Sequence, residues 1–581
     1  MKYLLIISLF LAMTSSGLSQ TYNTIKETSK YTIDSIYNEF ITTNEIAGAS
    51  IAIVDNGKIV YSQGYGFSDL ENQIKASDNT IFRIGSCTKS FTAMSIMQLQ
   101  DAGKLNVNDP ITNYIEELSM LDRFSKKNDL IIRDILTHTS GLPGDVLNGS
   151  FCDAPATTNL TILELNKQTF AAPNAYQLSY SNVGFELLGE VIARLSKQSY
   201  AEYLETNIFS PIGMKSSYVL GTTPIGYIDK KPFVEPLIRD QSAGLIHSNA
   251  IDMGNYLMLL LNRGKIGELQ VLSAPAILEM EKNQIEDVLF NYGSKWGYGL
   301  YKKMVKIESE KDTTLVEMIG HGGDTWVFHA DIKYIPELGI AAIIMTNTDK
   351  GARVTSAANL LKTYVELEKD KNLNLRVPKD KNTNLVETIP SESEIKGFYG
   401  VSTFPVIVEN TDVIKFKTGF GKAVLNQKND SMIYTGKINL FRIIPIKLKQ
   451  QEFKFVKING EVFLKNINVN SQQGFYEGRR LNLNPIPDEW AEMIGKYKAI
   501  NDFACTDCPA KVKQSTLKLS KKEGMLFFEV ETTGWVKGAC FIEIIGDGIA
   551  VTDGIGRGTG ETVKILENGN LYYSGYEFSK K

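Results

Sequence analysis

The stretch at residues 82–99, FRIGSCTKSFTAMSIMQL, constrains the fold of this chain more than any other segment. Ser86 is followed by good helix formers and by an apolar stripe: Phe91, Met94, Ile96, Met97 and Leu99. This pattern predicts a buried helix with Ser86 in its first turn. The rest of the chain is expected to be organised around this helix.

Ser86 and Lys89 lie three residues apart in this stretch. On a helix this spacing is a rise of about 4.5 Å and a return to nearly the same face, so the ammonium can reach the hydroxyl. A desolvated lysine with a lowered pKa can take the proton of a serine, and a helix N-terminus leaves N–H groups free for an oxyanion. The spacing alone is weak, since it recurs at 393–396 and 515–518, where solvated side chains are the simpler interpretation.

Length and composition bound the class of protein. A chain of 581 residues is too long for one core and predicts two to four domains. With 43% hydrophobic and 22% charged residues it resembles an ordinary soluble globular protein. A net charge of −4 without an obviously basic domain argues against a nucleic-acid partner.

Residues 1–19 have the pattern of a secretory signal peptide. Lys2 precedes an apolar run at 3–13, and Gly17-Leu18-Ser19 places small residues at the cleavage positions. About eleven apolar residues are too few to span a bilayer. We therefore expect removal after Ser19, export to the periplasm or the extracellular space, and no membrane or lipid anchor.

Only two of the five cysteines have a spacing that suggests a paired site. Cys505 and Cys508, in CTDC, have a spacing that fits a local disulfide, a redox pair or half a zinc site. Because all four histidines precede residue 330, a disulfide is the preferred interpretation. Cys87 is interpreted as a small buried residue. No cofactor or metal is expected.

The order of elements predicts an α+β fold with one antiparallel sheet flanked by helices. Residues 49–54 and 59–64 form a hairpin around an Asn-Gly turn, and strand candidates return at 316–319, 327–335 and 340–345. Helical patterns lie between them, at 183–196 and 253–261 for example, and a closing helix is expected at 352–365. The two ends of this domain, 27–365, should therefore meet in the sheet.

The C-terminal part reads as all-β. A charged linker at 366–390 precedes short alternating strands. The five residues 395–399, IKGFY, resemble 493–497, MIGKY, 98 positions later. This similarity predicts two β domains, 391–484 and 488–581, with a single barrel over 391–581 as the alternative.

Three short patterns follow one another along the first domain: Ser86-x-x-Lys89, Tyr180-x-Asn182 and His321-Gly322-Gly323. Among 26 tyrosines only Tyr180 has an asparagine two positions on, and among four histidines only His321 has a glycine there. Their order resembles the penicillin-binding-protein-like serine hydrolases, in the branch of class C β-lactamases, D-aminopeptidases, D-stereospecific peptidases and related esterases. The stretches GKLNVNDPITNY, LTHTSGLP, YSNVGFELLGEVI and IFSPIGM support the resemblance over roughly residues 27–365.

The resemblance implies a β-lactamase/transpeptidase-like domain in which Ser86 is acylated. Lys89 and Tyr180 would share its proton and pass it to the leaving group, and Asn182 would hydrogen-bond Lys89 and the substrate amide. Independently, a tyrosine beside one or two cations is expected to have an accessible phenolate, although its ordinary pKa is near 10. His138, in LTHTSGLP, is interpreted as a structural residue that bonds a loop.

At the third motif the chain differs from the family that it resembles. His321 would line a strand where other members carry lysine, with Gly322, Gly323 and Trp326 beside the substrate. The backbone N–H groups of Ser86 and Asp324 would form the oxyanion hole. The carboxylate of Asp324 would oppose anionic substrates, bind a substrate ammonium, or stabilise a cationic His321.

The sequence therefore predicts an exported serine hydrolase that cleaves a small ester or a D-amino-acid peptide or amide bond through an acyl-enzyme. A β-lactamase or D-Ala-D-Ala carboxypeptidase is one alternative. A catalytically silent sensor or binding protein is another, but silent relatives usually lose the serine or its lysine, and both are present. The expected partner is a small-molecule or peptide substrate; the oligomeric state stays open.

Overall fold

The computed structural model describes residues 24–581 with several gaps: 125–128, 153–157, 310–311, 377–385, 402–405, 409–412, 419–420, 429–430, 441–443, 448–450, 469–472, 482–483, 503–513, 523, 533–536 and 555–556. The predicted signal peptide at 1–19 and the Cys505–Cys508 pair lie outside the described residues. Within them, no helix is long and apolar enough to cross a membrane. No cluster of three metal-ligating side chains occurs in the same part of the chain.

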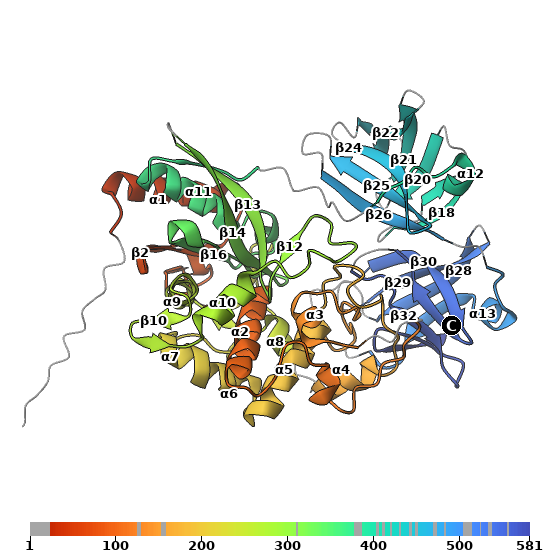
Figure 1. The fold of residues 1–581 in the computed structure, drawn as a ribbon, viewed down its shortest axis with the longest axis horizontal. Helices are drawn as coiled ribbons and strands as arrows, with labels where there is room; N and C mark the ends of the chain where they lie inside the picture. Colours follow the sequence, from red (N-terminus) through yellow and green to blue (C-terminus); the bar gives the residue numbers. More distant parts are fainter. Residues whose placement is uncertain are drawn as a thin grey trace, which may run out of the picture.

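One antiparallel sheet joins the two ends of the first domain, as predicted. Its strands run in the order β12 (Lys295–Trp296), β13 (Tyr301–Glu308), β14 (Thr313–Asp324), β15 (His329–Ile335), β16, β1, β2 and β3 (Ile74–Lys75). Strand β1 (Gly48–Asp55) lies between β2 (Lys58–Asp69) and β16 (Ile340–Thr346), with Ile51 opposite Ile344. Figure 1 shows the sheet with helices on both sides. The α+β fold class is confirmed.

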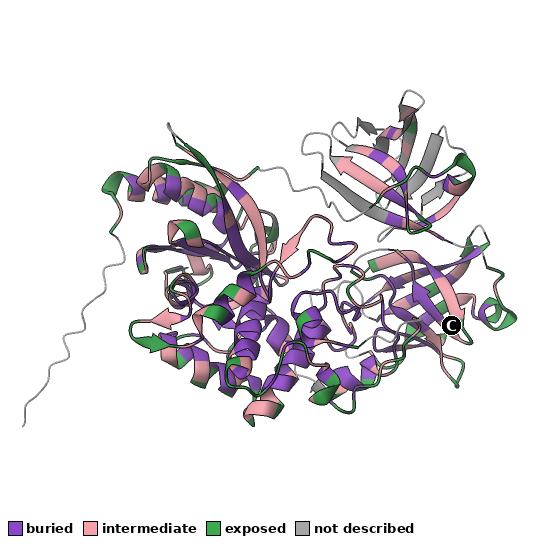
Figure 2. Ribbon diagram, in the orientation of Figure 1, coloured by how far each residue is buried: buried purple, intermediate pink, exposed green. Residues whose placement is uncertain are grey.

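Every residue of β1 is buried, because both faces of the sheet are covered (Figure 2). Alternate residues of a strand point to opposite faces. Ile51 and Ile53 pack in the same apolar cluster as residues of α1 (Glu27–Thr43) and α11 (Ala357–Glu368). Ala52 and Val54 instead join the large cluster that contains α9 (Ala250–Leu261).

The helical layer on the second face is built around α2 (Thr88–Asp101). Eleven of its fourteen residues are buried, which is the pattern of a helix enclosed on all sides. It packs against α5 (Asn182–Ser196), α8 (Gln241–Gly244) and α10 (Ala274–Glu281). The predicted buried helix is confirmed, with a short 3-10 turn at Gly85–Cys87 in place of its first α-helical turn.

Two segments differ from the sequence predictions. Helix α4 (Thr158–Leu165) was not predicted, because the apolar spacing of residues 144–176 is weak. The predicted linker at 366–390 begins too early: α11 runs to Glu368, and β17 (Asn372–Asn374) pairs with β13 (Tyr301–Glu308). Leu373 is completely buried, in the apolar cluster that also contains residues of α1 and α11. Leu375 packs against the same apolar cluster, so two leucines in a charged stretch accompany the additional strand.

The C-terminal all-β region contains two sheets rather than one barrel. The described strands β18 to β26, from Gly397 to Leu481, form one sheet, and β27 to β34, from Gly495 to Lys580, close into a barrel. In both units a short helix, α12 (Glu392–Ile395) or α13 (Asp488–Glu492), precedes the first strand. Tyr399 and Tyr497 each donate a hydrogen bond to the carbonyl four residues earlier, at 2.8 and 2.5 Å. The five-residue similarity thus marks one local structure used twice.

The barrel packs against the loops near α3 (Ile132–Leu136) and α4 (Figure 1). The amide of Asn148 donates to the carbonyl oxygens of Asn501 and Gly575, at 2.9 and 3.0 Å. Leu147 packs on the apolar core of the barrel. The segment 144–150 is therefore held by a domain that begins more than 300 residues later.

We expect residues 20–376, expressed alone, to fold and to unfold cooperatively, because the sheet and both its apolar clusters lie within this range. Ending the chain at residue 368 should lower the melting temperature, since it removes Leu373, whose burial stabilises by about 1.5–3 kcal/mol. Amide exchange at 144–150 should be faster than in the full chain, because the bonds of Asn148 to the barrel are lost. Failure to obtain either fragment in a stable form would mean that the β domains are integral to the core.

Candidate active site

Ser86 lies where the helical layer meets the sheet. Gly85 has φ +51, a conformation that favours glycine, and a Cβ there would lie 2.8 Å from the backbone nitrogen of Asp324. A Cβ on Gly323 would lie 1.9 Å from the carbonyl oxygen of Ile84. The turn before α2 and the end of β14 (Thr313–Asp324) are therefore in direct backbone contact. This contact brings the N–H groups of Ser86 and Asp324, the predicted oxyanion hole, into one place.

Lys89 is completely buried beside Ser86. Its Nζ donates hydrogen bonds to three oxygen atoms: Ser86 Oγ at 3.1 Å, Asn182 Oδ1 at 2.8 Å and the Ala243 carbonyl at 2.6 Å. Burial holds the pKa of the Lys89 ammonium well below its ordinary value, and the positive charge of Arg557 lowers it further. In its neutral form the Lys89 amine donates only two hydrogen bonds, to Asn182 and Ala243, and its lone pair can accept the proton of the Ser86 hydroxyl.

The second motif stands at the start of α5. Ser181 caps this helix by accepting a hydrogen bond from the Gly184 N–H at 3.1 Å, which fixes Asn182 as its first residue. The Ser181 N–H donates to His138 Nδ1 at 3.1 Å, and the ring centres of His138 and Tyr180 are 4.1 Å apart. The prediction that His138 is structural is confirmed, because it bonds the segment that positions Tyr180 and Asn182.

Tyr180 differs from the expectation. Burial raises the pKa of its hydroxyl above the ordinary value, although a hydrogen bond with Ser86 and the charge of Arg557 act in the opposite direction. The prediction of an accessible phenolate is therefore wrong for the protein without substrate. Desolvation among the rings of His138, Trp296 and His321 outweighs the neighbouring cations. Tyr180 is a neutral phenol, which can donate a proton.

His321, on β14, is buried and neutral. Burial and the charge of Lys89 lower the pKa of its imidazole to about 3. Asp324 does not contact this ring: its carboxylate lies 2.7 Å from Nδ1 of His329, the residue opposite it in the strand pair. The expectation that Asp324 could stabilise a cationic His321 is therefore not met. The Asp324 side chain is 64% exposed.

The two glycines of the third motif serve different purposes. A Cβ on Gly322 would lie 3.9 Å from Asp331, the residue opposite it in the strand pair, which is an ordinary contact. Gly323 has no such room, because it packs on the turn that carries Ser86. Trp326 stacks on Phe151 and Phe233, with ring centres 4.6 and 5.8 Å away. Trp326 is thus held in an aromatic cluster beyond the end of β14.

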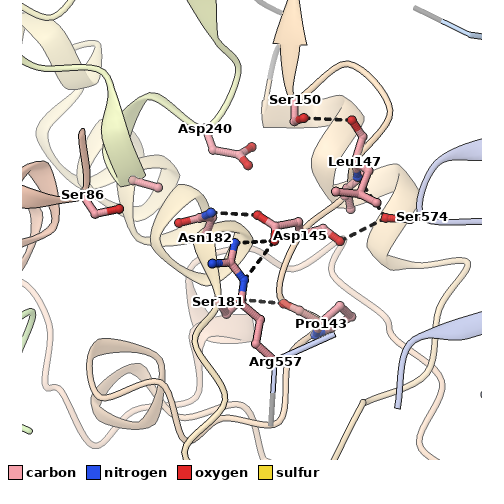
Figure 3. A network of polar contacts seen from close by, with 12 residues as sticks. Ser86, Pro143, Asp145, Leu147, Ser150, Ser181, Asn182, Asp240, Arg557 and Ser574 are labelled. Atoms are coloured by element: carbon pink, nitrogen blue, oxygen red, sulfur yellow. Dashed lines mark hydrogen bonds and ion pairs between the residues drawn. The ribbon is translucent and has the colours of Figure 1, made fainter. Parts of the chain in front are cut away.

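Sequence reasoning missed two charged residues of the site, Asp145 and Arg557 (Figure 3). Asp145 accepts a hydrogen bond from Asn182 Nδ2 at 2.7 Å through one carboxylate oxygen. Its other oxygen accepts bonds from Nη2 and Nε of Arg557, at 2.5 and 3.2 Å. Arg557 comes from the barrel, 412 positions away, and its guanidinium lies 5.2 Å from the centre of the Tyr180 ring. The only sequence signal was the glycine-rich stretch 554–560 that contains it.

Comparison with known proteins identifies relatives over the first domain. The family model described as Beta-lactamase matches residues 33–365. Protein flp of Staphylococcus aureus strain MW2 is 33% identical over 192 residues, which are 32% of this chain and 38% of that protein. Putative penicillin-binding protein PbpX of Bacillus subtilis strain 168 is 30% identical over 226 residues, 37% of this chain and 54% of that protein. The chain thus spans about four-tenths to half of the length of these relatives.

Two solved structures share the fold. The octameric penicillin-binding protein homologue from Pyrococcus abyssi has a TM-score of 0.51 at 23% identity, covering 78% of this chain and all of that one. The structure of SurE with D-Leu has a TM-score of 0.54 at 17% identity, with the same coverage. The family match covers more than half of the chain and contains all three motifs. The chain therefore belongs to the Beta-lactamase family and has the fold of the penicillin-binding-protein-like serine hydrolases.

Proposed function

We propose that this protein is an exported serine hydrolase that forms an acyl-enzyme on Ser86 and cleaves small esters or D-amino-acid peptide or amide bonds. One observation carries the proposal: the buried Nζ of Lys89 lies 3.1 Å from Ser86 Oγ. A serine needs such a base before it becomes a nucleophile. The composition of residues 1–19 supports export.

Acylation begins when Ser86 Oγ attacks the substrate carbonyl carbon and its proton passes to the neutral amine of Lys89. Negative charge develops on the carbonyl oxygen. The backbone N–H groups of Ser86 and Asp324 are fixed before the reaction by the close contact at Gly85 and Gly323, so they can stabilise this oxyanion without reorganisation.

Tyr180 then acts as the proton donor. Its hydroxyl is neutral and hydrogen-bonded to Ser86, so it can protonate the leaving oxygen or nitrogen as the carbonyl–leaving-group bond breaks. The proton held by Lys89 restores Tyr180. In deacylation a water molecule attacks the ester carbon, gives its proton to Lys89, and the bond to Ser86 Oγ breaks as the oxygen regains a proton.

Two alternatives are less well supported. A β-lactamase or D-Ala-D-Ala carboxypeptidase would benefit from a permanent cation on the strand of the third motif, and the neutral His321 does not supply one. A silent sensor would not need Lys89 to be desolvated and bonded to Ser86. Both observations favour hydrolysis of substrates that need no ion pair with His321.

The substrate prediction is tested by comparing kcat/KM at pH 7 for a chromogenic cephalosporin, a p-nitrophenyl ester and a D-alanine amide. We expect the ester or the amide to be preferred by about tenfold or more, because the ionic contact of one substrate carboxylate is worth roughly 1.5–3 kcal/mol. The Ser86→Ala protein serves as the blank. A cephalosporin preferred over both other substrates would show that another cation performs the task of the missing lysine.

A further inference from the structure

We propose that Arg557 of the C-terminal barrel determines specificity by binding a carboxylate on the acyl part of the substrate. This inference rests on the proposed acyl-enzyme function and assigns a substrate class to its site. It gives the barrel, which lies outside the family match at 33–365, a direct part in substrate recognition.

The barrel loop that carries Arg557 is anchored against the first domain. It connects β31 (Ile549–Thr552) with β32 (Thr562–Ile565). The Gly560 N–H donates to the Thr552 carbonyl at 2.6 Å, and a Cβ on Gly560 would lie 2.0 Å from the carbonyl oxygen of Ala171. The Thr169 N–H donates to Thr562 Oγ1 at 2.9 Å. The base of the loop is therefore fixed on both domains, which places Arg557 at the site in a defined position.

Asp145 orients the Arg557 guanidinium but does not occupy all of its hydrogen-bond donors. Asp145 accepts hydrogen bonds from Nε and Nη2 of Arg557. A Cβ on Gly144 would lie 3.0 Å from Arg557 Cγ, so the aliphatic part of the arginine packs directly against the backbone of Gly144. Nη1 forms no hydrogen bond with another residue that the structure describes. Figure 3 shows it pointing away from Asp145, toward the side of the view where Ser86 lies. The side chain is 47% exposed.

The chemistry of the neighbouring groups favours an anionic ligand. The fork of a guanidinium matches the geometry of a carboxylate, and arginine keeps its charge at any physiological pH. Lys89 already donates to three oxygens, and His321 is neutral. Asp145 is only 19% exposed and uses both oxygens, while the nearby Asp240 is paired with the buried Arg239 at 2.7 Å. Arg557 thus presents positive charge and donors where the adjacent carboxylates are already occupied.

The position of Arg557 specifies which part of the substrate it meets. Through Asp145 it is joined to Asn182, the residue predicted to hydrogen-bond the substrate amide. His321 lies on β14, the strand at the other side of Ser86. A carboxylate near Arg557 would therefore belong to the acyl group and would stay on the enzyme after the leaving group departs.

The experiment compares two esters of equal chain length on the full-length protein: p-nitrophenyl hexanoate and mono-p-nitrophenyl adipate, which adds a terminal carboxylate. We expect Arg557→Ala to lower kcat/KM for the adipate ester about 10- to 100-fold, mainly through KM, because a charged hydrogen bond contributes roughly 1.5–3 kcal/mol. The hexanoate ester should change less than about threefold. Arg557→Lys should recover part of the loss. Arg194→Ala, which breaks a surface ion pair with Glu117, is the matched control and should change neither ester.

An equal loss on both esters would overturn the proposal and leave Arg557 as a positioning residue for Asn182. A hexanoyl ester of p-hydroxybenzoate moves the carboxylate to the leaving group; greater dependence on Arg557 with this ester would overturn the acyl-side assignment. If the wild-type protein hydrolyses no ester, the proposed function fails separately. Adipate binding to Ser86→Ala, with and without Arg557→Ala, is then measured by tryptophan fluorescence, and equal affinities would reject the arginine site.

Discussion

Ser86→Ala is expected to abolish covalent labelling by a fluorescent phosphonate and to lower turnover by about 10⁴-fold or more, while leaving the melting temperature unchanged. The reason is that the acyl-enzyme cannot form without the hydroxyl that Lys89 bonds at 3.1 Å. Lys89→Ala should lose nearly as much, because residues that form one proton-transfer unit have strongly non-additive effects. Gel fluorescence, peptide mapping of the label and steady-state kinetics measure these outcomes.

Two matched controls sharpen this experiment. Cys87 is adjacent to Ser86, but it is buried, and burial raises the pKa of its thiol, so Cys87→Ala should still label. Ser393→Ala removes the serine of another Ser-x-x-Lys pair, one outside the family match, and should also label fully. Label that persists in Ser86→Ala, or that moves to Cys87, would refute the assignment of the nucleophile.

Glu235→Ala is expected to destabilise the protein by about 3–5 kcal/mol, the largest effect on stability that we predict. Arg83 and Glu235 form an ion pair at 2.7 Å, and neither side chain is exposed. Removing the carboxylate leaves a buried, uncompensated guanidinium. The same carboxylate accepts bonds from Thr325 Oγ1 and the Val327 N–H, so it also ties the turn before Ser86 to the segment after Asp324.

Urea unfolding followed by tryptophan fluorescence can measure this loss. The double variant Arg83→Met with Glu235→Leu should lose less than Glu235→Ala alone, because an apolar pair leaves no buried charge. Glu117→Ala breaks the partly exposed pair with Arg194 and should cost less than about 1 kcal/mol. If Glu235→Ala cost no more than Glu117→Ala, the buried pair would not be what holds this part of the site.

The parts of the site that follow local rules could be predicted from the sequence. The spacing of Ser86 and Lys89 on a helix is set by the helical repeat, and the structure places them in contact. Tyr180 and Asn182 were recognisable because only one tyrosine of the chain has an asparagine two positions on, and a long amphipathic helix follows it. The hairpin around the Asn-Gly turn and the return of strands near residue 340 also follow local signals.

The remaining features depend on packing between segments far apart in the chain. Asp145 and Arg557 meet only because the barrel docks on the loop at 144–150, and no spacing rule connects positions 412 residues apart. The raised pKa of Tyr180 follows from burial among aromatic rings, whereas neighbouring charges alone suggested the opposite direction. Strand β17 pairs with β13 where Leu373 and Leu375 pack against an apolar cluster, although the charged residues around them predicted a linker.

The central strand β1 has a consequence for how the protein is made. The Ala47 N–H donates to Thr348, 301 positions later, and β1 and β16 pair along their whole length beside it. At about 5–20 residues per second, a ribosome needs roughly 15–60 seconds to supply that partner. Until then an apolar strand edge has nothing to pair with and is open to other chains. The nascent chain therefore exposes an apolar strand edge throughout this interval, and the site around Ser86 is complete only once the sheet closes.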